Sequence, residues 1–422
     1  MILRVKTLSP VHIGNGEKYN GLSYIANRGK VLFYDSAKVM ENLTPQHSER
    51  FAQWIEQSTA EIEQLEKQKR NEQIEQRRRD DIVQQLRNAQ KKLSLKELLE
   101  NTIRDISIKT RFNQNFLYAA EAQSQVYNNV NIECFIKQNN KPYIPGSEMK
   151  GAIRTAVTYK LLQQDIHWLW LSENLVSFGR KYSNELKQIA GQKGKWVSEI
   201  KKKLVREISK IEQNLQNNLF RTQRNPDAKY DILKFLSISD SEAKRPEDIL
   251  FVSDIKIEGT RPLKIFQEFC KKDQLFTCQG FRLENNTTII NKLGFTPEQK
   301  WIISDIKNIL QCCYEFSDRL LQEEIDYFTK LKKQQIVTKL QNIKQQNIPS
   351  SPVIRIGKNE GYLSLTMGLL VKDKDKAFYD NALCHATKNT SYTGNFPKTR
   401  RVVNISNNEQ DTLGWMKLII EN

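Results

Sequence analysis

The first 35 residues alternate apolar and polar positions and are interrupted by glycine. The segments LRVKTL, LSYIA and VLFYD are separated by Gly14-Asn15-Gly16 and by Asn27-Arg28-Gly29. Alternation with a period of two is typical of a half-buried strand, and Asn/Gly pairs favour tight turns between antiparallel strands. The pattern therefore predicts strands, glycine turns and a β-hairpin at the amino terminus.

Between about Pro45 and Lys109 the pattern changes to apolar residues at steps of three and four among Glu, Gln, Lys and Arg. Phe51, Trp54 and Ile55 begin this series. Such spacing places the apolar side chains on one face of an amphipathic helix. Because a segment with a strand-like residue pattern, NIECFI, follows it, we interpret 45–109 as a helical pair or coiled hairpin inserted into a sheet domain.

Two more helical segments follow, at about 184–219, which is polar and basic, and at about 296–347, which ends before Ser350-Ser351-Pro352. Strand-like segments lie between and after them, for example FLSIS, DILFVSDIKIEG, LKIFQEFC and LGWMKLIIE. Alternating strands and helices in two blocks favour an α+β chain of two sheet domains. We place these domains at 1–235, with the helical segments 45–109 and 184–219, and at 236–422, with the helical insertion 296–347.

Composition limits the classes of protein that this chain can represent. The 422 residues are long enough for two domains, and apolar residues make up 38 %, below the roughly 45–50 % of an average globular chain. Neither a signal peptide nor an uncharged membrane-spanning run of about 18 residues is present in the sequence. Six cysteines without a CxxC pair and four scattered histidines predict a reduced, cytoplasmic protein without disulfides, structural zinc or any cofactor.

The net charge of +17 comes from 66 basic and 49 acidic residues and is unevenly distributed. Residues 180–234 contribute +8, whereas 41–110 hold 13 basic and 13 acidic residues and contribute nothing. The excess of basic over acidic residues is therefore not a uniform property of this sequence. An excess of this size indicates an anionic partner such as nucleic acid, although a Lys-rich and Gln-rich segment can also be a plain solvated surface.

The segment KPYIPGSEMKGAIRTAV, residues 141–157, is the most informative motif. A strand ends before Pro145-Gly146, Ser147 can cap a helix, and apolar residues from Met149 onward form a buried stripe. Lys150 and Arg154 then lie one turn apart on the same flank. A helix amino terminus with two nearby cations suits a phosphate. A well-capped core helix with two solvated cations is the alternative.

Two other loops combine cations with glycine or aromatic residues. In IRIGKNEGYLSL, Arg355, Gly357, Lys358 and Gly361 lie between β-like halves, as in a loop whose backbone amides meet phosphates, although a plain hairpin turn fits as well.

In NFPKTRRVV, the cations crowd a loop near Tyr392 and Phe396, and this mixture suits single-stranded nucleic acid, because phosphates need positive charge and bases stack. The candidate cations are Lys398, Arg400 and Arg401.

Catalytic interpretations have less support. His12 in PVHIG could act as a general base, but a single His in an apolar strand is more often a hydrogen-bonded core residue. Asp35, Asp240 and Asp254 could hold Mg²⁺, yet they are far apart in the sequence. The sequence has no GxSxG, HExxH or Cys/His pairing. We therefore assign no catalytic and no metal-binding residue.

Taken together, five segments in this order resemble the RAMP proteins of type III CRISPR systems, and among them the family of fifth Csm subunits of the type III-A effector. These segments are LSPVHIGNGEKY, YIPGSEMKGAIRTAV, FVSDIKIEGTR, IRIGKNEGYL and NFPKTRRVV with LGWMKLIIE. The resemblance implies tandem ferredoxin-like, RNA-recognition-type domains. It matches Lys150 and Arg154 to basic positions of the helix motif, and Gly357 and Gly361 to the glycine-rich loop.

The resemblance also implies a function. The expected role is that of a non-nucleolytic, RNA-binding structural subunit for antiviral defence, which caps the backbone filament at the guide-RNA 3′ end and supports maturation of that end. Its expected partners are the guide RNA, single-stranded target RNA near the guide 3′ end, sister Csm subunits and recruited cellular nucleases, without a membrane. Two alternatives stay open: a metal-independent endoribonuclease that uses His12 on precursor guide RNA, and a protein-docking platform built from the helical insertions.

Overall fold

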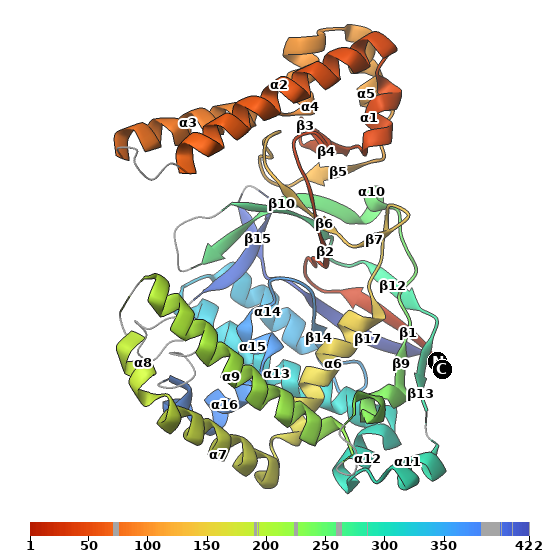
Figure 1. The fold of residues 1–422 in the computed structure, drawn as a ribbon. Helices are drawn as coiled ribbons and strands as arrows, with labels where there is room; N and C mark the ends of the chain where they lie inside the picture. The colour runs from red at the N-terminus through yellow and green to blue at the C-terminus, as the bar shows by residue number, and fades with distance from the viewer. Residues whose placement is uncertain are drawn as a thin grey trace.

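The computed structural model describes residues 1–70, 76–189, 192, 194–222, 227–258, 264–284, 286–380, 397, 399–406 and 408–421. Helices and sheets are mixed along the chain, which confirms the α+β class. Figure 1 shows two sheets in the middle of the molecule, a group of helices below them and a helical arm that extends from the top. The described part includes no helix with both the length and the apolar character needed to cross a bilayer.

The smaller sheet joins the two ends of the chain. Its strand order is β12 (Leu275–Cys278), β1 (Ile2–Thr7), β17 (Trp415–Glu421) and β14 (Val353–Arg355), and every pairing is antiparallel. In β1 the burial alternates, with Leu3, Val5 and Thr7 buried, as the period-two pattern predicts. This alternation points one face of the sheet into the main hydrophobic core.

The larger sheet has nine strands and takes them from both halves of the sequence. Its path is β2 (Gly14–Tyr19), β6 (Ile132–Phe135), β11 (Ile265–Cys270), β10 (Leu250–Glu258), β5 (Tyr118–Ala122), β4 (Lys30–Phe33) and β3 (Tyr24–Asn27). Strand β15 (Arg400–Ser406) pairs with β10, and β16 (Glu409–Asp411) pairs with β15. Both sheets therefore combine strands from either side of residue 235, so packing between 1–235 and 236–422 is extensive.

The glycine turns of the amino terminus have different outcomes. Strands β3 and β4 form the predicted hairpin, with Arg28 and Gly29 at positive φ in its two-residue turn. The predicted turn at Gly14-Asn15-Gly16 is wrong, because these residues belong to β2. Strand β2 pairs with β6 in an irregular register between Gly14 and Lys18, so the glycines lie at a bulge in a strand.

The described residues of the segment 45–109 are largely helical, as predicted. Helices α2 (Pro45–Arg70) and α3 (Gln76–Lys92) pack along each other as the arm of Figure 1, around a small apolar cluster that includes Leu65, Ile82 and Leu86. The base of the arm packs on the β3–β4 hairpin through a separate core. The base of the arm consists of α1 (Ser36–Asn42), α4 (Leu95–Glu97), the π-helical η1 (Leu98–Ile103) and α5 (Ile106–Gln114).

Three helices form the centre of the lower half: α6 (Gly146–Leu161), α13 (Ile306–Lys330) and α14 (Gln334–Gln346). In α13 the buried residues recur at three- and four-residue steps, for example Leu310, Cys313 and Phe316, and they face α6 and β14. The predicted helical segment 296–347 is thus present, but α13 belongs to the hydrophobic core and is no peripheral addition.

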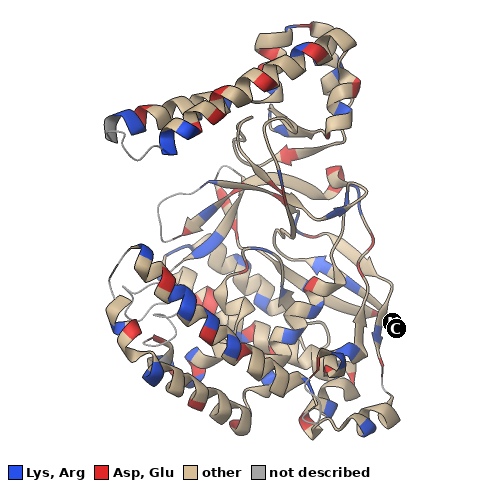
Figure 2. Cartoon of the chain, in the orientation of Figure 1, with Lys and Arg blue, Asp and Glu red and all other residues tan. Residues whose placement is uncertain are grey.

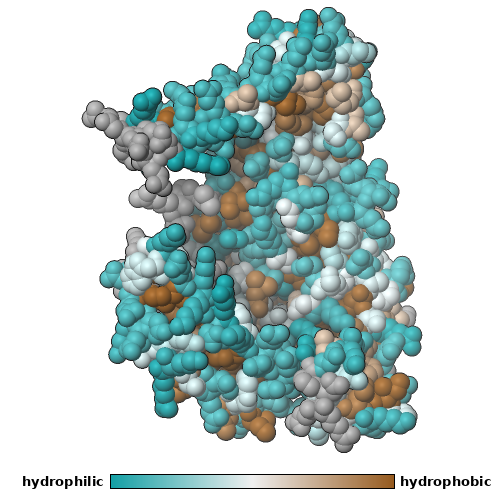
Figure 3. Space-filling model, in the orientation of Figure 1, coloured by the Kyte–Doolittle hydropathy of each residue, from teal (hydrophilic) through white to brown (hydrophobic). Residues whose placement is uncertain are grey.

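The predicted helical segment 184–219 corresponds to α8 (Ser183–Ile189) and α9 (Lys195–Phe220), which pack beside α7 (Asp165–Lys181). Figure 3 shows that α9 and the arm present mostly hydrophilic surface on the face shown.

The five described cysteines are free and buried. The remaining elements are β7 (Lys137–Gln138), β8 (Lys141–Pro142), η2 (Ala228–Tyr230), η3 (Ile232–Phe235), β9 (Leu236–Ile238), α10 (Pro246–Ile249), β13 (Phe281–Leu283), α11 (Thr287–Leu293), α12 (Pro297–Ser304), α15 (Tyr362–Leu365), α16 (Gly368–Lys374) and α17 (Lys376–Phe378).

Candidate nucleic-acid interface

The helix of the YIPGSEMKGAIR motif is α6, and its apolar stripe is buried as predicted, with Met149 and Val157 both 0 % exposed. The helix begins at Gly146 after Pro145, and Ser147 does not cap it. Instead, the backbone N–H of Gly146 donates to Oδ1 of Asp240 at 2.8 Å. A carboxylate of this chain therefore occupies the anion-binding end of α6, where the sequence suggested a phosphate.

The two predicted cations of α6 hold the start of β9 and the segment before it. Lys150 Nζ donates to the carbonyl oxygen of Leu236 at 2.8 Å, and partial burial lowers the pKa of Lys150. Arg154 donates to Oδ2 of Asp231 at 2.7 Å and stacks on the ring of Phe220 at 4.4 Å. The side chain of Arg154 is about one-third exposed, and Lys150 is less buried than core residues. Each therefore combines a structural contact with an accessible edge.

Arg355 and Arg400 lie in the interior and not at the surface. Both guanidinium groups pair with the carboxylate of Glu324 on α13, with Arg355 NH1 at 3.2 Å from Oε2 and Arg400 in direct contact with Oε1. The three side chains are only 2–5 % exposed. A buried charge needs an opposite charge because desolvation is costly. The charges of this triad therefore compensate one another inside the fold, and neither arginine is available to RNA.

Further contacts fix each arginine of the triad. Arg355 Nε donates to the carbonyl oxygen of Leu413 at 2.9 Å, and its guanidinium stacks on Trp415. Arg400 NH1 donates to the carbonyl oxygen of Pro397 at 2.9 Å, and its guanidinium lies 4.3 Å from the ring centroid of Tyr327. Planar guanidinium groups combine such hydrogen bonds with stacking, which lysine cannot do equally well. The sequence interpretation of these two residues as RNA contacts is thus corrected.

Arg401 and Lys358 remain on the surface, on one side of the larger sheet. Arg401 follows Arg400 in β15 and is exposed, because neighbouring residues of a strand point to opposite faces. Its guanidinium donates to the side-chain oxygen of Asn359. Lys358 Nζ is half exposed and pairs with Oε2 of Glu133 at 2.7 Å. The loop 357–361 thereby brings the two predicted cations into one polar network.

This network continues across the sheet through groups that the motif interpretation missed. Asn359 donates to Gln267 on β11, which contacts Glu133 on β6, and Lys18 on β2 lies 3.7 Å from the same carboxylate. Burial acts to raise the pKa of Glu133, but hydrogen bonds from Lys358 and Gln267 outweigh it and lower the pKa. The sequence signal that could have identified Glu133 is a charged residue in the middle of the otherwise apolar strand segment NIECF.

The two glycines of the loop serve different purposes. Gly357 has φ +89°, and a side chain there would clash with the carbonyl oxygen of His12, to which the N–H of Lys358 donates at 2.8 Å. Gly361 has φ +92°, but a side chain there would meet nothing within 4 Å. Close packing against the chain after β1 therefore requires Gly357, whereas Gly361 faces open space. The second half of the loop forms the helix α15 and not the predicted strand.

Other predicted residues lie away from this face or outside the described residues. Lys398, Tyr392 and Phe396 fall in segments that the structure does not describe. His12 is buried: its Nδ1 hydrogen-bonds the carbonyl oxygen of Glu268 at 2.7 Å, and burial lowers its pKa. The location of His12 in the core does not favour a role as general base on an RNA substrate.

The three candidate Mg²⁺ ligands have separate structural contacts. Asp35 caps α1, Asp240 caps α6 as described above, and Asp254 accepts from Asn404 Nδ2 at 2.9 Å. Among the residues that the structure describes, no three His, Cys, Asp or Glu side chains gather in a way that could hold a metal ion.

The basic segment 180–234 presents its cations on the outside of α9. Lys195, Lys202 and Arg206 are exposed, and Figure 2 shows the basic positions along this helix. Within the described part of the chain, Lys202 and Arg206 have no ion-pair partner, whereas Lys203 pairs with Glu185. A row of unpaired cations attracts a polyanion without sequence selectivity. The sequence had indicated the positive charge of this segment but contained no recognisable binding motif in it.

Comparison with protein families identifies the superfamily. The model of the RAMP superfamily matches residues 4–334. Two curated relatives are each described as "CRISPR system Cms protein Csm5": one from Methanocaldococcus jannaschii is 24 % identical over 168 residues, and one from Streptococcus thermophilus is 29 % identical over 188 residues. These matches span 39 % and 42 % of this chain, and only about a third and two-fifths, 32 % and 42 %, of the relatives' own lengths.

Solved structures extend the likeness of the fold to nearly the whole chain. A chain of a cryo-EM structure of a Csm-crRNA-target RNA ternary complex of a type III-A CRISPR-Cas system superposes with a TM-score of 0.64 and 20 % identity, covering 99 % of this chain and 100 % of that chain. A crystal structure of T. onnurineus Csm5 superposes with a TM-score of 0.59 and 19 % identity, covering 98 % and 99 %. The fold resemblance deduced from the five sequence segments is confirmed.

Proposed function

Because this chain belongs to the RAMP superfamily, we propose that it is an RNA-binding structural subunit of a type III-A CRISPR (Csm) ribonucleoprotein. The observation that carries the proposal is the exposed pair Lys358 and Arg401, which a glycine-flanked loop and strand β15 hold together on one sheet face. Curated relatives described as Csm5 support the assignment of the complex. The proposal assigns no catalytic step to the chain.

On this proposal, Lys358, Arg401 and Lys18 contact the RNA backbone. Their present partners, Glu133 and Asn359, keep the cations in place, while the side chains of Lys358 and Lys18 are 50 % and 53 % exposed. A phosphate can therefore approach these cations from the solvent side. Gly361 leaves room beside them. The exposed cations of α9 add general attraction.

Lys150 and Arg154 are proposed as secondary contacts through their accessible edges. Each already holds the segment before β9, so we expect them to add electrostatic attraction and not to bind a phosphate alone. Gly357 supports the loop from within.

The finer role that we propose is the cap of the backbone filament at the guide-RNA 3′ end, in the cytoplasm. There the subunit would contact the guide, the adjoining single-stranded target RNA and sister Csm subunits. Maturation of the guide 3′ end would then depend on nucleases that the complex recruits. Purified complexes with and without the subunit test this role: its absence should leave guides with altered 3′ ends and shorten the filament, and unchanged guide ends with an intact filament would disprove it.

The RNA-binding surface is tested with the full-length chain and a single-stranded RNA at increasing salt. Replacing Lys358 and Arg401 together by Ala should weaken binding and reduce the slope of log K against log salt by about 1.4, since each phosphate contact on a single strand contributes about 0.7. Circular dichroism checks that the variant is folded.

A matched control removes the same charge from the distant corner formed by β13 and α11. The double variant Arg282→Ala and Lys292→Ala neutralises two exposed cations there and should keep the wild-type salt slope. If both double variants lose affinity equally, binding follows net charge and the proposed face is wrong.

A further inference from the structure

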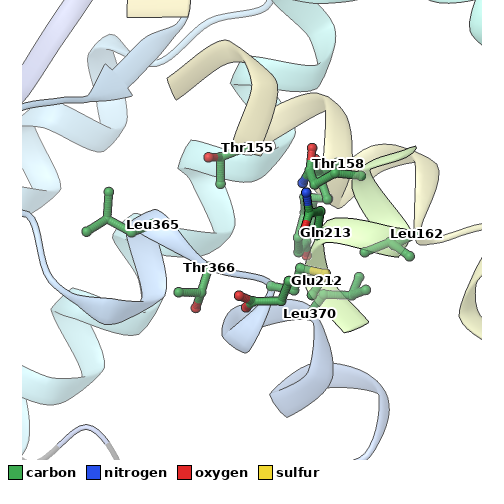
Figure 4. Close-up of a pocket in the computed structure, with 11 residues that line it drawn as sticks. Thr155, Thr158, Leu162, Glu212, Gln213, Leu365, Thr366 and Leu370 are labelled. Carbon is green, nitrogen blue, oxygen red and sulfur yellow. The ribbon is translucent and has the colours of Figure 1, made fainter. Parts of the chain in front are cut away.

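A pocket of about 200 Å³ lies between α6, α9 and the segment α15–α16 (Figure 4). Its walls combine polar side chains with an apolar part that includes Leu162, Met367 and Leu370. Leu365 stands at its edge with 61 % of its surface exposed. The volume is sufficient for one long side chain, and the apolar walls suit the methylene stem of such a side chain.

Two acceptor groups from α9 face this pocket. Glu212 and Gln216 are one turn apart and therefore lie on the same side of the helix. Burial raises the pKa of the Glu212 carboxyl, and in the described part of the chain no Lys or Arg pairs with it. The side-chain oxygen of Gln216 is buried and accepts no hydrogen bond. A buried acceptor without a donor is costly, so the Gln216 oxygen is a reason to expect a donor from outside, and the unpaired Glu212 carboxyl beside it favours a cationic one.

The hydroxyl groups that line the pocket make it still poorer in donors. Thr158 donates to the carbonyl oxygen of Arg154 at 2.9 Å, Thr155 to that of Gly151 and Thr366 to that of Tyr362. Each of these three threonine hydroxyls therefore directs its proton to the backbone and keeps only lone pairs for a guest, and the hydroxyl of Tyr159 donates to Oδ2 of Asp373.

The hydroxyl of Thr158 also fixes the amide of Gln216. Since its proton goes to the backbone, Thr158 accepts from Gln216 Nε2 at 3.3 Å, which directs the amide oxygen elsewhere. The pocket thus offers several acceptors, and its donors are the exposed amide of Gln213 and the second N–H of Gln216 Nε2.

From this juxtaposition we propose that the pocket receives an arginine side chain from a neighbouring protein subunit. The carboxylate of Glu212 pairs with the guanidinium, the oxygen of Gln216 accepts a second N–H, and the apolar walls contain the stem. Arginine fits better than lysine because its planar fork presents five donors that can reach two acceptors a helical turn apart. RNA fits poorly, since the Glu212 carboxylate, unlike Glu133 of the proposed RNA face, has no paired cation beside it among the described residues and repels phosphate. The inference goes beyond the proposed RNA-binding role.

Methyl NMR of the full-length chain gives a direct test, because the chain has five methionines and Met367 lines the pocket. The probe is the capped tripeptide Gly-Arg-Gly, and its neutral counterpart contains citrulline in place of arginine. We expect the arginine peptide to shift the Met367 methyl resonance in a saturable manner, with the buried Met149 unchanged and the citrulline peptide at least tenfold weaker. Equal binding of both peptides, or no shift at Met367, would overturn the proposal.

Variants separate the carboxylate of the pocket from the general charge of α9. Glu212→Gln should weaken the arginine peptide at least tenfold, whereas Glu199→Gln, an exposed carboxylate on the same helix, should bind it as the wild type does. Both variants should keep the RNA affinity of the wild type, so that failure of the pocket and failure of the RNA-binding proposal are distinguishable. Equal peptide affinity in Glu212→Gln and wild type would refute the role of Glu212.

The source of the arginine is tested by crosslinking in the purified complex. A photoreactive benzoylphenylalanine in place of Gln213, at the exposed edge of the pocket, should crosslink to a protein subunit through a peptide that contains arginine. A crosslink to RNA would identify the pocket as a nucleotide site and would overturn the proposal. Failure to crosslink to any subunit would likewise overturn it.

Discussion

The interior triad and the surface network use cations from the same two sequence segments but give them opposite roles. IRIGKNEGYL contributes Arg355 to the interior and Lys358 to the surface, and TRRVV contributes Arg400 to the interior and Arg401 to the surface. Counting cations in these two motifs therefore overstates the number of cations accessible to a partner by about a factor of two. The deciding property is which face of the strand or loop each side chain occupies.

The two groups also differ in how firmly each cation is held. In the triad, Glu324 is the shared counter-charge of two desolvated guanidinium groups, and losing it leaves both uncompensated. At the surface, Glu133 and Asn359 hold Lys358 and Arg401, and the side chains of these two cations stay in contact with solvent. The interior pair is suited to stability, and the exposed pair is suited to reversible binding.

The largest expected effect tests this division at its interior end. Glu324→Gln should lower the free energy of unfolding by about 3–5 kcal/mol, the usual cost of removing one partner from a buried ion pair. The measurement is urea denaturation followed by circular dichroism.

The matched control for this variant is Glu315→Gln on the same helix. Glu315 pairs with Lys160 at 2.7 Å, but its side chain is 25 % exposed, so we expect a loss of no more than about 1 kcal/mol. Equal losses in the two variants would show that the triad contributes no more than a partly exposed ion pair does.

Sequence patterns predicted much of the local structure for clear physical reasons. Period-two alternation identified β1 and the β3–β4 hairpin, and three- and four-residue spacing identified α6 and the segments 45–109, 184–219 and 296–347. Sequence could not predict the order of the strands, because β10 pairs in parallel with β5 and antiparallel with β15, which are distant in the chain. The division into domains at residue 235 stays a prediction.

The candidate site was less predictable because its determinants are long-range contacts. Adjacent strand residues point to opposite faces, so one of Arg400 and Arg401 had to be internal, but only the position of Glu324, 76 residues before Arg400, decides which. Similarly, Asp240 occupies the amino terminus of α6 from 94 residues further along the chain. The local pattern of the helix motif contains no trace of that carboxylate.

A smaller effect is expected from Glu360, which lies between the interior and surface groups in the same loop. Burial raises its pKa from 4.5 to about 8; the nearby Arg355 opposes this and Glu148 adds to it. A carboxyl whose pKa is raised by folding binds its proton more tightly in the folded state. It therefore favours folding fully below about pH 4.5, and that stability is lost as the pH rises towards 8.

Unfolding measured from pH 5 to pH 8 in wild type and in Glu360→Gln isolates this contribution. The stability difference, variant minus wild type, should rise with pH by a few kcal/mol, since each unit of pKa shift corresponds to about 1.4 kcal/mol. Other titrating groups, including the buried Asp411, largely cancel in this difference. A difference that stays constant between pH 5 and pH 8 would mean that Glu360 is not desolvated in the loop.

The smallest effect compares the two glycines that connect interior and surface. Both have positive φ, so an alanine at either position is strained by roughly 1–2 kcal/mol. Gly357→Ala adds a clash with the carbonyl oxygen of His12, whereas Gly361→Ala meets open space. We therefore expect Gly357→Ala to lower the melting temperature more than Gly361→Ala. A larger loss at Gly361 would mean that the loop packs against another surface at that residue, and the exposed face proposed for Lys358 and Arg401 would then be partly closed.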